Sequence, residues 1–255
     1  MSPPSDSAEP SATPLAGESS ATRRVAIVTG ASQGIGAGVA ESFRGAGYAV
    51  VGTSRSISPS DASDFLTVRG DIAEVETAQM IAAQAVNRFG RIDTLINNAG
   101  IFISKPFTDY TLDDYLAITA VNLTGFFHIT QAVIRQILTQ GTGGHIVNIT
   151  TSLVDHPESK NPSALVALTK GGLAALTRSL AIEYASRGLR FNAVGLGVIE
   201  NPVYDPASYE GLAQLHPLGR VGQIGDVVQG VLYLEEASFV TGVVLHVDGG
   251  QSAGN

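Results

Sequence analysis

Short apolar runs alternate with longer segments of helical spacing along most of this chain of 255 residues. Runs of strand length predict seven strands, at residues 25–28, 48–53, 64–69, 92–96, 144–150, 189–194 and 243–247. Segments of helical spacing separate most of them, at residues 37–43, 74–89, 111–140, 162–186 and 224–234. This alternation predicts a parallel sheet built from βαβ units.

Local signals refine these elements. Thr111, with Asp114 three residues later, predicts a helix cap, and Pro162 predicts a first helical position. Only about ten residues, 54–63, separate the second and third strands, so a turn or a single helical turn is expected there instead of a crossover helix. Residues 199–217 are interpreted as an irregular insert with the character of a lid.

Composition places the chain among globular proteins, with 44% hydrophobic and 15% charged residues. Residues 1–22 lack the apolar core of a secretory signal and predict a disordered tail before a single domain at residues 23–255. The net charge of −8, without a basic run, argues against nucleic acid and anionic membranes as partners. Cysteine is absent and no uninterrupted apolar run approaches the ~20 residues of a membrane span, so a cytoplasmic protein is expected.

The first predicted strand ends in a turn with three glycines, Gly30, Gly34 and Gly36, and a helical segment follows at once. A strand, a glycine turn and a helix together direct backbone N–H groups and a helix N-terminus at a pyrophosphate. Glycine is needed there because a Cβ would block the close approach of the ligand. An ordinary turn is the alternative, since the chain holds 29 glycines.

Further candidate cofactor contacts lie where successive strands end, which is the edge at which open parallel sheets bind ligands. Ser54 and Arg55 follow the second strand, where an acidic residue would bind NAD and an arginine accommodates the extra phosphate of NADP. A guanidinium matches phosphate, so NADP(H) is favoured over NAD(H), with a solvated loop charge as the alternative for Arg55. The next two strands end near Asp71 with Ile72 and near Asn98.

Four segments together resemble the short-chain dehydrogenase/reductase family: TGASQGIG at 29–36, NNAG at 97–100, Asn122 within AVNLTG, and GHIVNIT at 144–150. FVTGVVLHVDGG at 239–250 resembles the family's C-terminal strand and turn, so the likeness covers residues 24–250. It implies a single Rossmann-type domain, a doubly wound parallel sheet of about seven strands with helices on both faces. It also implies a nicotinamide cofactor, hydride transfer to a carbonyl or from an alcohol, and a homotetramer or homodimer.

The cofactor contacts predicted from the motifs and from this resemblance are Gly30, Ser32, Gln33, Gly34, Ile35, Gly36, Ser54, Arg55, Asp71, Ile72, Asn98, Ala99, Gly100, Lys170 and Ile199. No metal site is predicted.

The family's chemistry uses Asn, Ser, Tyr and Lys, with the tyrosine as general acid/base four residues before the lysine. In the family, the lysine lowers the pKa of the tyrosine and holds the nicotinamide ribose, and the asparagine holds a water. Asn122 and Lys170 are present here, and the serine position falls on Thr151, with Ser152 as the second choice. The tyrosine position is Val166, which has no proton to give. None of the seven tyrosines has a lysine four residues later.

The loop after the sixth predicted strand also departs from the family pattern, with Leu196 in place of proline and Asn201 in place of threonine. An amide still bonds a nicotinamide carboxamide or a diphosphate, so this change is compatible with cofactor binding. Apolar residues of the insert and of nearby loops predict a mainly apolar substrate pocket: Phe102, Ile103, Leu153, Val203, Tyr204, Tyr209 and Leu212.

Three replacements for the missing phenol remain open. Another side chain enters the site, for which His156, Tyr204 and Tyr209 are the candidates. Alternatively, a water held by Thr151, Lys170 and Asn122 supplies the proton. In the third case the fold binds its cofactor without turnover.

The sequence therefore predicts an NADP(H)-dependent oxidoreductase with altered proton transfer. Its small-molecule substrate would be a mainly apolar carbonyl or alcohol, or an imine or enone that needs less protonation. The alternative is a non-catalytic cofactor-binding sensor or assembly protein on the same fold. Dehydration or isomerisation in the same pocket is a third class.

Overall fold

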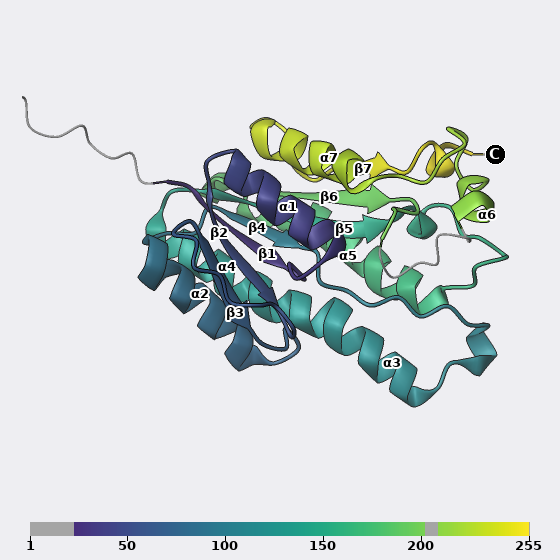
Figure 1. Ribbon diagram of the computed structural model, residues 1–255, viewed down its shortest axis with the longest axis horizontal. Helices are drawn as coiled ribbons and strands as arrows, with labels where there is room; N and C mark the ends of the chain where they lie inside the picture. The colour runs from purple at the N-terminus through teal and green to yellow at the C-terminus, as the bar shows by residue number, and fades with distance from the viewer. Residues whose placement is uncertain (1–22, 202–208, 255) are drawn as a thin grey trace, which may run out of the picture.

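The computed structural model describes residues 23–201 and 209–254 (Figure 1). Its centre is a seven-stranded sheet, parallel throughout, with the order β3-β2-β1-β4-β5-β6-β7. The strands are β1 (Val25–Thr29), β2 (Ala49–Ser54), β3 (Phe65–Arg69), β4 (Thr94–Asn97), β5 (Gly144–Thr151), β6 (Leu189–Leu196) and β7 (Val244–Val247). The strand order reverses between β1 and β4, which creates a crevice at their carboxyl ends.

Helices cover both faces of the sheet (Figure 1). They are α1 (Gly34–Gly45), α2 (Val75–Phe89), α3 (Leu112–Thr119), α4 (Phe126–Gln140), α5 (Ala164–Tyr184), α6 (Tyr209–Ala213) and α7 (Ile224–Glu236). Helix α1 packs beside α7 on one face, and α2 packs beside α4 on the other, where α5 also lies. The doubly wound, Rossmann-type sheet that the sequence predicts is confirmed.

Two apolar cores, one on each face, account for the continuous apolar runs of the central strands. In β1, Val25 and Ile27 face the core formed with α2 and α4, while Ala26 and Val28 face the core formed with α1 and α7. Successive side chains of a strand point to opposite faces, so a strand covered on both faces is apolar at every position. All five residues of β1 are accordingly buried.

Most predicted elements are present, in the predicted order, with ends that differ by no more than three residues. Residues 55–64 contain no helix, in agreement with the short spacing between β2 and β3. The prediction that Pro162 begins a helix is wrong, because α5 begins at Ala164 with Ser163 as the N-cap. The Pro162 carbonyl instead accepts hydrogen bonds from the Ser104 hydroxyl and the Lys105 backbone N–H, which tie the loop after β5 to the loop after β4.

The long helix predicted at residues 111–140 is interrupted by a π-helical segment, η2 (Ala120–Gly125), between α3 and α4. The predicted cap is confirmed, since the Thr111 hydroxyl accepts from Asp114 N–H and the Asp114 carboxylate accepts from Thr111 N–H. Single π turns occur often at functional sites. Here the extra residue belongs to the turn that carries Asn122, a buried side chain beside the cleft described below.

Two helical stretches, Leu112–Gln140 and Ala164–Arg187, have the length and average hydropathy of a membrane span. The sequence predicts no membrane span, because neither stretch contains an uninterrupted apolar run of that length. Both stretches pack on the sheet, and apolar helices of this kind are also the core helices of soluble proteins. The predicted tail at residues 1–22 and the insert residues 202–208, including Val203 and Tyr204, lie outside the described residues.

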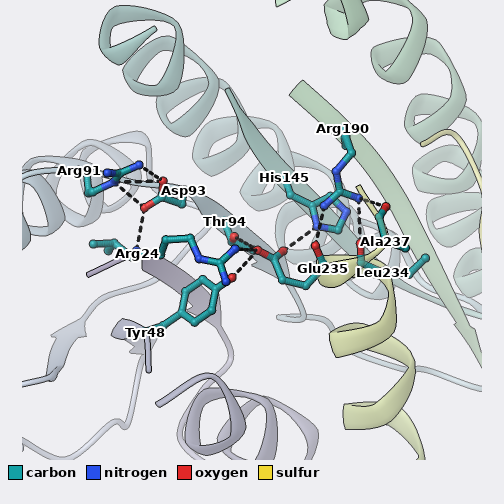
Figure 2. Close-up of polar contacts among 11 residues, drawn as sticks. Arg24, Tyr48, Arg91, Asp93, Thr94, His145, Arg190, Leu234, Glu235 and Ala237 are labelled. Carbon is teal, nitrogen blue, oxygen red and sulfur yellow. Dashed lines mark hydrogen bonds and ion pairs between the residues drawn. The ribbon is translucent and has the colours of Figure 1, made fainter. Parts of the chain in front are cut away.

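A buried carboxylate, Glu235, joins four elements at the amino-terminal edge of the sheet (Figure 2). The hydroxyls of Tyr48 and Thr94 donate to its Oε1 at 2.7 and 2.9 Å, and His145 Nδ1 lies 2.7 Å from its Oε2. Arg24 lies 3.8 Å from Oε1 and supplies a positive charge. These residues precede or begin β1, β2, β4 and β5, so one side chain of α7 fixes the relative heights of four strands.

The hydrogen bonds also determine the protonation of this cluster. Val243 N–H donates to Asn192 Oδ1, so the Asn192 amide group points its N–H at His145 Nε2, 3.0 Å away. His145 Nε2 is therefore an acceptor and Nδ1–H donates to Glu235, which makes the imidazole neutral. Burial likewise lowers the pKa of His145. Burial alone would raise the pKa of Glu235, but the hydrogen bonds from His145, Tyr48 and Thr94 outweigh it and hold that pKa below its ordinary value.

Glu235→Gln tests this cluster with almost no change in volume. Because donors surround both carboxylate oxygens, either orientation of the new amide places its N–H₂ against a donor. We expect a loss of about 2–4 kcal/mol in the free energy of unfolding, measured by urea denaturation. The matched control is Glu236→Gln, which removes the same charge from an exposed neighbour on α7 and should change stability by less than about 0.5 kcal/mol. Equal losses in the two variants would contradict the role of Glu235.

Candidate active site

A cleft of about 460 Å³ runs along the carboxyl ends of β3, β2, β1, β4 and β5. It crosses the point between β1 and β4 where the strand order reverses. Its outer end lies over β2 and β3, beside Arg55 and Asp71, and its inner end lies over β5 and α5, beside Thr151 and Lys170. Most of the residues predicted as cofactor contacts, and two of the four predicted for catalysis, therefore face one continuous space.

The glycine turn forms the floor of the cleft because it packs very closely on the end of β4. A Cβ on Gly36 would stand 2.2 Å from the Gly30 carbonyl oxygen and 2.6 Å from Asn98 Nδ2. Gly30 and Gly34 have φ angles of 68° and 56°, which favour glycine. Only glycine fits all three positions, so α1 begins directly at the cleft.

Hydrogen bonds fix the turn to β4. The Asn98 side chain donates to the Thr29 carbonyl at 2.9 Å. The Thr29 hydroxyl in turn accepts from the backbone N–H groups of Asn98 and Ala99, at 3.0 and 2.9 Å. The two strands at the switch point are thereby held in one rigid unit, which sets the width of the cleft.

The residues present fit a dinucleotide. No side chain caps the N-terminus of α1, where Gln33 is the N-cap, so the first backbone N–H groups of the helix are available to an anion. The Thr53 hydroxyl at the end of β2 is buried beside the cleft and has no hydrogen-bond partner among the described residues. Such an orphaned group calls for a ligand atom or an ordered water.

The outer end of the cleft carries a positive charge. Arg55 is exposed and forms no ion pair with any described residue. Arg69, from the end of β3, donates through Nε to the Arg55 carbonyl at 2.7 Å and so supports the backbone of this loop. The Ser54 hydroxyl accepts from Ser56 N–H, which orders the same loop. A free guanidinium above an ordered loop is a suitable phosphate site.

Lys170 occupies the inner end of the cleft. It is 9% exposed, and its ammonium group donates to the Ile149 carbonyl of β5 at 2.8 Å. Burial lowers the pKa of Lys170 to about 8. The position that a Cβ of Gly100 would occupy lies only 3.1 Å from Lys170 Nζ and 3.3 Å from Asn122 Oδ1, so glycine there leaves room for the ammonium group.

Asn122 braces the loop after β4 and does not line this cleft. Its Oδ1 accepts from Ile101 N–H, and its Nδ2 donates to the Ile101 carbonyl and to the Thr169 hydroxyl. The π-helical segment η2 places this amide so that all its bonds go to the protein. Asn122 consequently holds the wall beside Lys170 in place.

Of the two candidates for the serine position, Thr151 lines the cleft and Ser152 does not. The Thr151 oxygen accepts from Leu153 N–H, which leaves its hydroxyl proton for a ligand. Ser152 is fully buried, and its hydroxyl bonds to the Leu196 carbonyl and to Gln251 Oε1. The geometry therefore favours Thr151.

Val166 stands one helical turn before Lys170 on α5 and lines the same cleft. It is 2% exposed and packs in a small apolar cluster with Ile118 and Leu165. Tyr110 packs against this cluster, but its hydroxyl donates to the Ile103 carbonyl at 2.7 Å. The wall that would carry a phenol in the family pattern is therefore apolar.

The other proposed replacements for the phenol are not brought into the cleft. His156 lies 4.0 Å from Glu158, and neither lines the cleft. The Tyr209 hydroxyl bonds to the backbone of Asn201, and Tyr204 lies outside the described residues. Among the predicted cofactor contacts, Gly34 and Ile199 do not line the cleft: Gly34 shapes the turn, and Ile199 is buried against Gly222.

The sequence analysis missed several lining residues. Thr29 and Thr53 are polar ends of apolar strands, and only the depth of the crevice shows that they face a ligand space. The carbonyl of Ile149 holds Lys170 through the backbone, which no side-chain pattern reveals. Val121 and Thr150 also line the cleft, although the family motifs that contain them did not single them out as contacts.

Comparison with known proteins agrees with this geometry. A family model described as "Enoyl-(Acyl carrier protein) reductase" matches residues 30–252. A 3-oxoacyl-[acyl-carrier-protein] reductase of Synechocystis sp. is 34% identical over 244 residues, which cover 90% of this chain and 97% of that protein. A glucose 1-dehydrogenase of Gluconobacter oxydans is 31% identical, over 88% of this chain and 90% of that protein.

Among solved structures, one titled "ElxO with NADP Bound" superposes with a TM-score of 0.84 at 27% identity, covering 91% of this chain and all of that one. The ligand-free aldohexose dehydrogenase of Thermoplasma acidophilum gives a TM-score of 0.83 at 30% identity, over 91% of this chain and 95% of that one. The chain belongs to the short-chain dehydrogenase/reductase family, and it is an oxidoreductase by this relationship.

Gly36→Ala tests the floor of the cleft. The added methyl group would collide with the Gly30 carbonyl, so the turn must open, and we expect the affinity for NADPH, measured by fluorescence titration, to fall at least about tenfold. The matched control is Gly45→Ala in the same helix, where a Cβ meets nothing within 4 Å and affinity should be unchanged. Unchanged affinity in both variants would contradict a cofactor site at this turn.

Proposed function

We propose that this protein is an NADP(H)-dependent oxidoreductase that transfers a hydride to or from a small, mainly apolar carbonyl or alcohol, or an imine or enone. The observation that carries the proposal is that Thr151 and Lys170 face one cleft with the glycine turn, while Val166 replaces the phenol. The bound nicotinamide cofactor supplies or accepts the hydride. Proton transfer must then use groups other than a tyrosine.

The chain's own residues divide this work along the cleft. The glycine turn and the N-terminus of α1 hold the diphosphate, and Thr53 and Asp71 lie where an adenosine would rest. The Thr151 hydroxyl is placed to donate a hydrogen bond to a substrate oxygen, since it already accepts from Leu153 N–H. Lys170 is positioned to hold the nicotinamide ribose, and the residues that fix it exclude water from its inner side.

The outer end of the cleft supports a preference for NADP(H) over NAD(H). Arg55 has no ion-pair partner among the described residues, and the position before it is Ser54, which does not repel a phosphate. A bidentate guanidinium–phosphate contact is a strong, charge-assisted interaction.

Arg55→Gln should weaken NADPH binding roughly tenfold or more and change NADH binding less than threefold, because only NADPH carries the phosphate that Arg55 would meet. Fluorescence titration with both cofactors measures this ratio. Arg135→Gln is the matched control, since it removes the same charge from the exposed side of α4, away from the cleft. Equal weakening of NADPH and NADH binding would contradict the preference.

The substrate end of the cleft is apolar. Ile101, Phe102 and Val166 line it beside Thr151, and no charged side chain other than Lys170 lies at this end among the described residues. Such a lining favours a small apolar substrate over a sugar phosphate or a dicarboxylate.

The apolar replacement of the phenol also supports a second candidate function, a cofactor-binding sensor or assembly protein without turnover. A panel of ketones, imines and enones, assayed for NADPH oxidation, separates the two. Turnover of any member supports the oxidoreductase. Tight NADPH binding with no turnover across the panel would overturn it and favour the sensor.

Val166→Tyr restores the family's acid at the position one turn before Lys170. We expect ketone reduction by this variant to rise at least about tenfold, which is part of the ~10²–10⁴ that general acid catalysis contributes where no other acid serves the site. Val166→Phe is the matched control, because it adds the ring without the hydroxyl and should not raise the rate. If the Tyr and Phe variants change the rate equally, the hydroxyl group of a phenol is not what limits ketone reduction in this pocket.

We also propose a cytoplasmic homotetramer or homodimer. Large apolar side chains are exposed along α3, α4 and α5, and a second copy would cover them: Leu112, Leu116, Phe127, Leu168 and Leu176. Sedimentation equilibrium measures the oligomeric state.

A further inference from the structure

Lys170 is the one ionisable side chain at the inner end of the cleft, within the described residues. The other ionisable groups that line the cleft are Arg55 and Asp71, and both belong to its outer end, over β2 and β3. Of the candidate substitutes for the phenol that the structure describes, His156 lies near Glu158 outside the cleft, and the Tyr209 hydroxyl bonds to the Asn201 backbone. Among the described residues, Lys170 is therefore the side chain placed to give a proton to a substrate beside Thr151, while Tyr204 lies outside them.

The hydrogen bonding of Lys170 leaves N–H groups that can donate to a substrate. An ammonium group has three N–H bonds, and the Ile149 carbonyl accepts one of them at 2.8 Å. The described residues include no carboxylate paired with Lys170. One remaining N–H can hold a ribose hydroxyl while another faces the substrate.

The described groups nearest Nζ carry no charge. Strand β5 presents the Ile149 carbonyl, the loop after β4 presents Gly100, and η2 presents the Asn122 amide. On α5 itself, Val166 lies one turn away and contributes only methyl groups. A valine is several ångströms shorter than a tyrosine, so it leaves the ammonium group without a phenol between it and the substrate.

We propose that Lys170 is itself the acid of this enzyme, and that its ammonium group gives the proton that a tyrosine gives elsewhere in the family. This inference rests on the proposed oxidoreductase function. In reduction, the hydride adds to the carbonyl carbon, the C=O π bond breaks, and the oxygen takes a proton from Nζ. The amine is left neutral and regains a proton from water. In alcohol oxidation the neutral amine accepts the hydroxyl proton.

Burial supports this role, because it lowers the pKa of Lys170 to about 8. A general acid is most effective when its pKa lies near the working pH, and an ordinary lysine at ~10.4 is too weak an acid. Reduction requires the charged form, so its kcat should fall about tenfold per pH unit above pH 8. Oxidation requires the neutral form and should rise through the same range.

The first test needs no turnover. The chain has only three lysines, so protein labelled with ¹³C at lysine Cε gives three NMR signals, which Lys170→Arg and Lys160→Arg assign. We expect the Lys170 signal of the cofactor-free protein to titrate with a midpoint near pH 8. A midpoint above pH 10 would overturn the proposal, whether or not a substrate is known.

The second test is a double-mutant cycle in the presence of NADPH and a ketone from the panel. Lys170→Arg keeps the charge and donors for a ribose but gives up no proton in this pH range. It should lower ketone reduction at least 100-fold in the wild-type background, with a change in NADPH affinity below threefold. In the Val166→Tyr background the phenol donates the proton instead. The loss of rate caused by Lys170→Arg should therefore be at least tenfold smaller there.

Equal losses in the two backgrounds would show that Lys170 only positions the cofactor, and would overturn its role as the acid. Lys160→Arg, an exposed neighbour, is the control and should leave kcat unchanged. If the wild-type protein turns over no member of the panel, the proposed function itself fails. If it turns over ketones with a flat pH profile from 7 to 10 and an active Lys170→Arg variant, only the present inference fails.

Discussion

The close approach of the glycine turn to the end of β4 is the constraint on which the rest of the site depends. Gly36 lies so near the Gly30 carbonyl and Asn98 that a single methyl group would separate the two strands. Because the contact is made by backbone and by one amide, it is short and rigid, and α1 starts with its N–H groups at the crevice. The same contact places the loop after β4, and through Asn122 and Gly100 that loop forms the wall beside Lys170. Cofactor binding and the geometry of the catalytic end therefore depend on one packing contact.

The amino-terminal edge of the sheet also holds the strands in place, but it does so through polar side chains instead of a glycine turn. There the buried Glu235 accepts hydrogen bonds from groups on β4 and β5 and just before β2, while Arg190 on β6 donates to the carbonyls of Leu234 and Ala237 at the end of α7. A buried carboxylate is costly unless it is fully bonded, so this cluster tolerates little displacement. Because the strands are held at the amino-terminal edge, the carboxyl ends that line the cleft are held as well. The charged side chains at the amino-terminal edge stabilise the fold, whereas those at the carboxyl edge line the cleft.

At the carboxyl edge of the sheet, Val166 stands four residues before Lys170, where the family pattern has a tyrosine. Val166 lies in an apolar cluster and contributes no polar atom, whereas Lys170, Thr151 and the glycine turn remain in one cleft. A lysine without an acidic partner, inside an apolar wall, is a stronger acid than a lysine in water. The same burial that would serve a neighbouring phenol can thus make the ammonium group a proton donor. Under the proposed function, the fold sets the place of hydride transfer and these local side chains decide how the proton moves.

The sequence by itself determined the order of the strands and helices along the chain, the parallel sheet, the glycine turn and the valine four residues before Lys170. These features are local, because a strand buried on both faces is a continuous apolar run and a missing tyrosine is visible without a structure. Only the tertiary structure decided between Thr151 and Ser152, located the π turn at Asn122, and showed that His156 lies outside the cleft. It alone revealed the unpaired Thr53 hydroxyl, the Ile149 carbonyl on Lys170 and the cluster around Glu235. Each of these depends on contacts between residues far apart in the chain, which the periodicity of a sequence cannot encode.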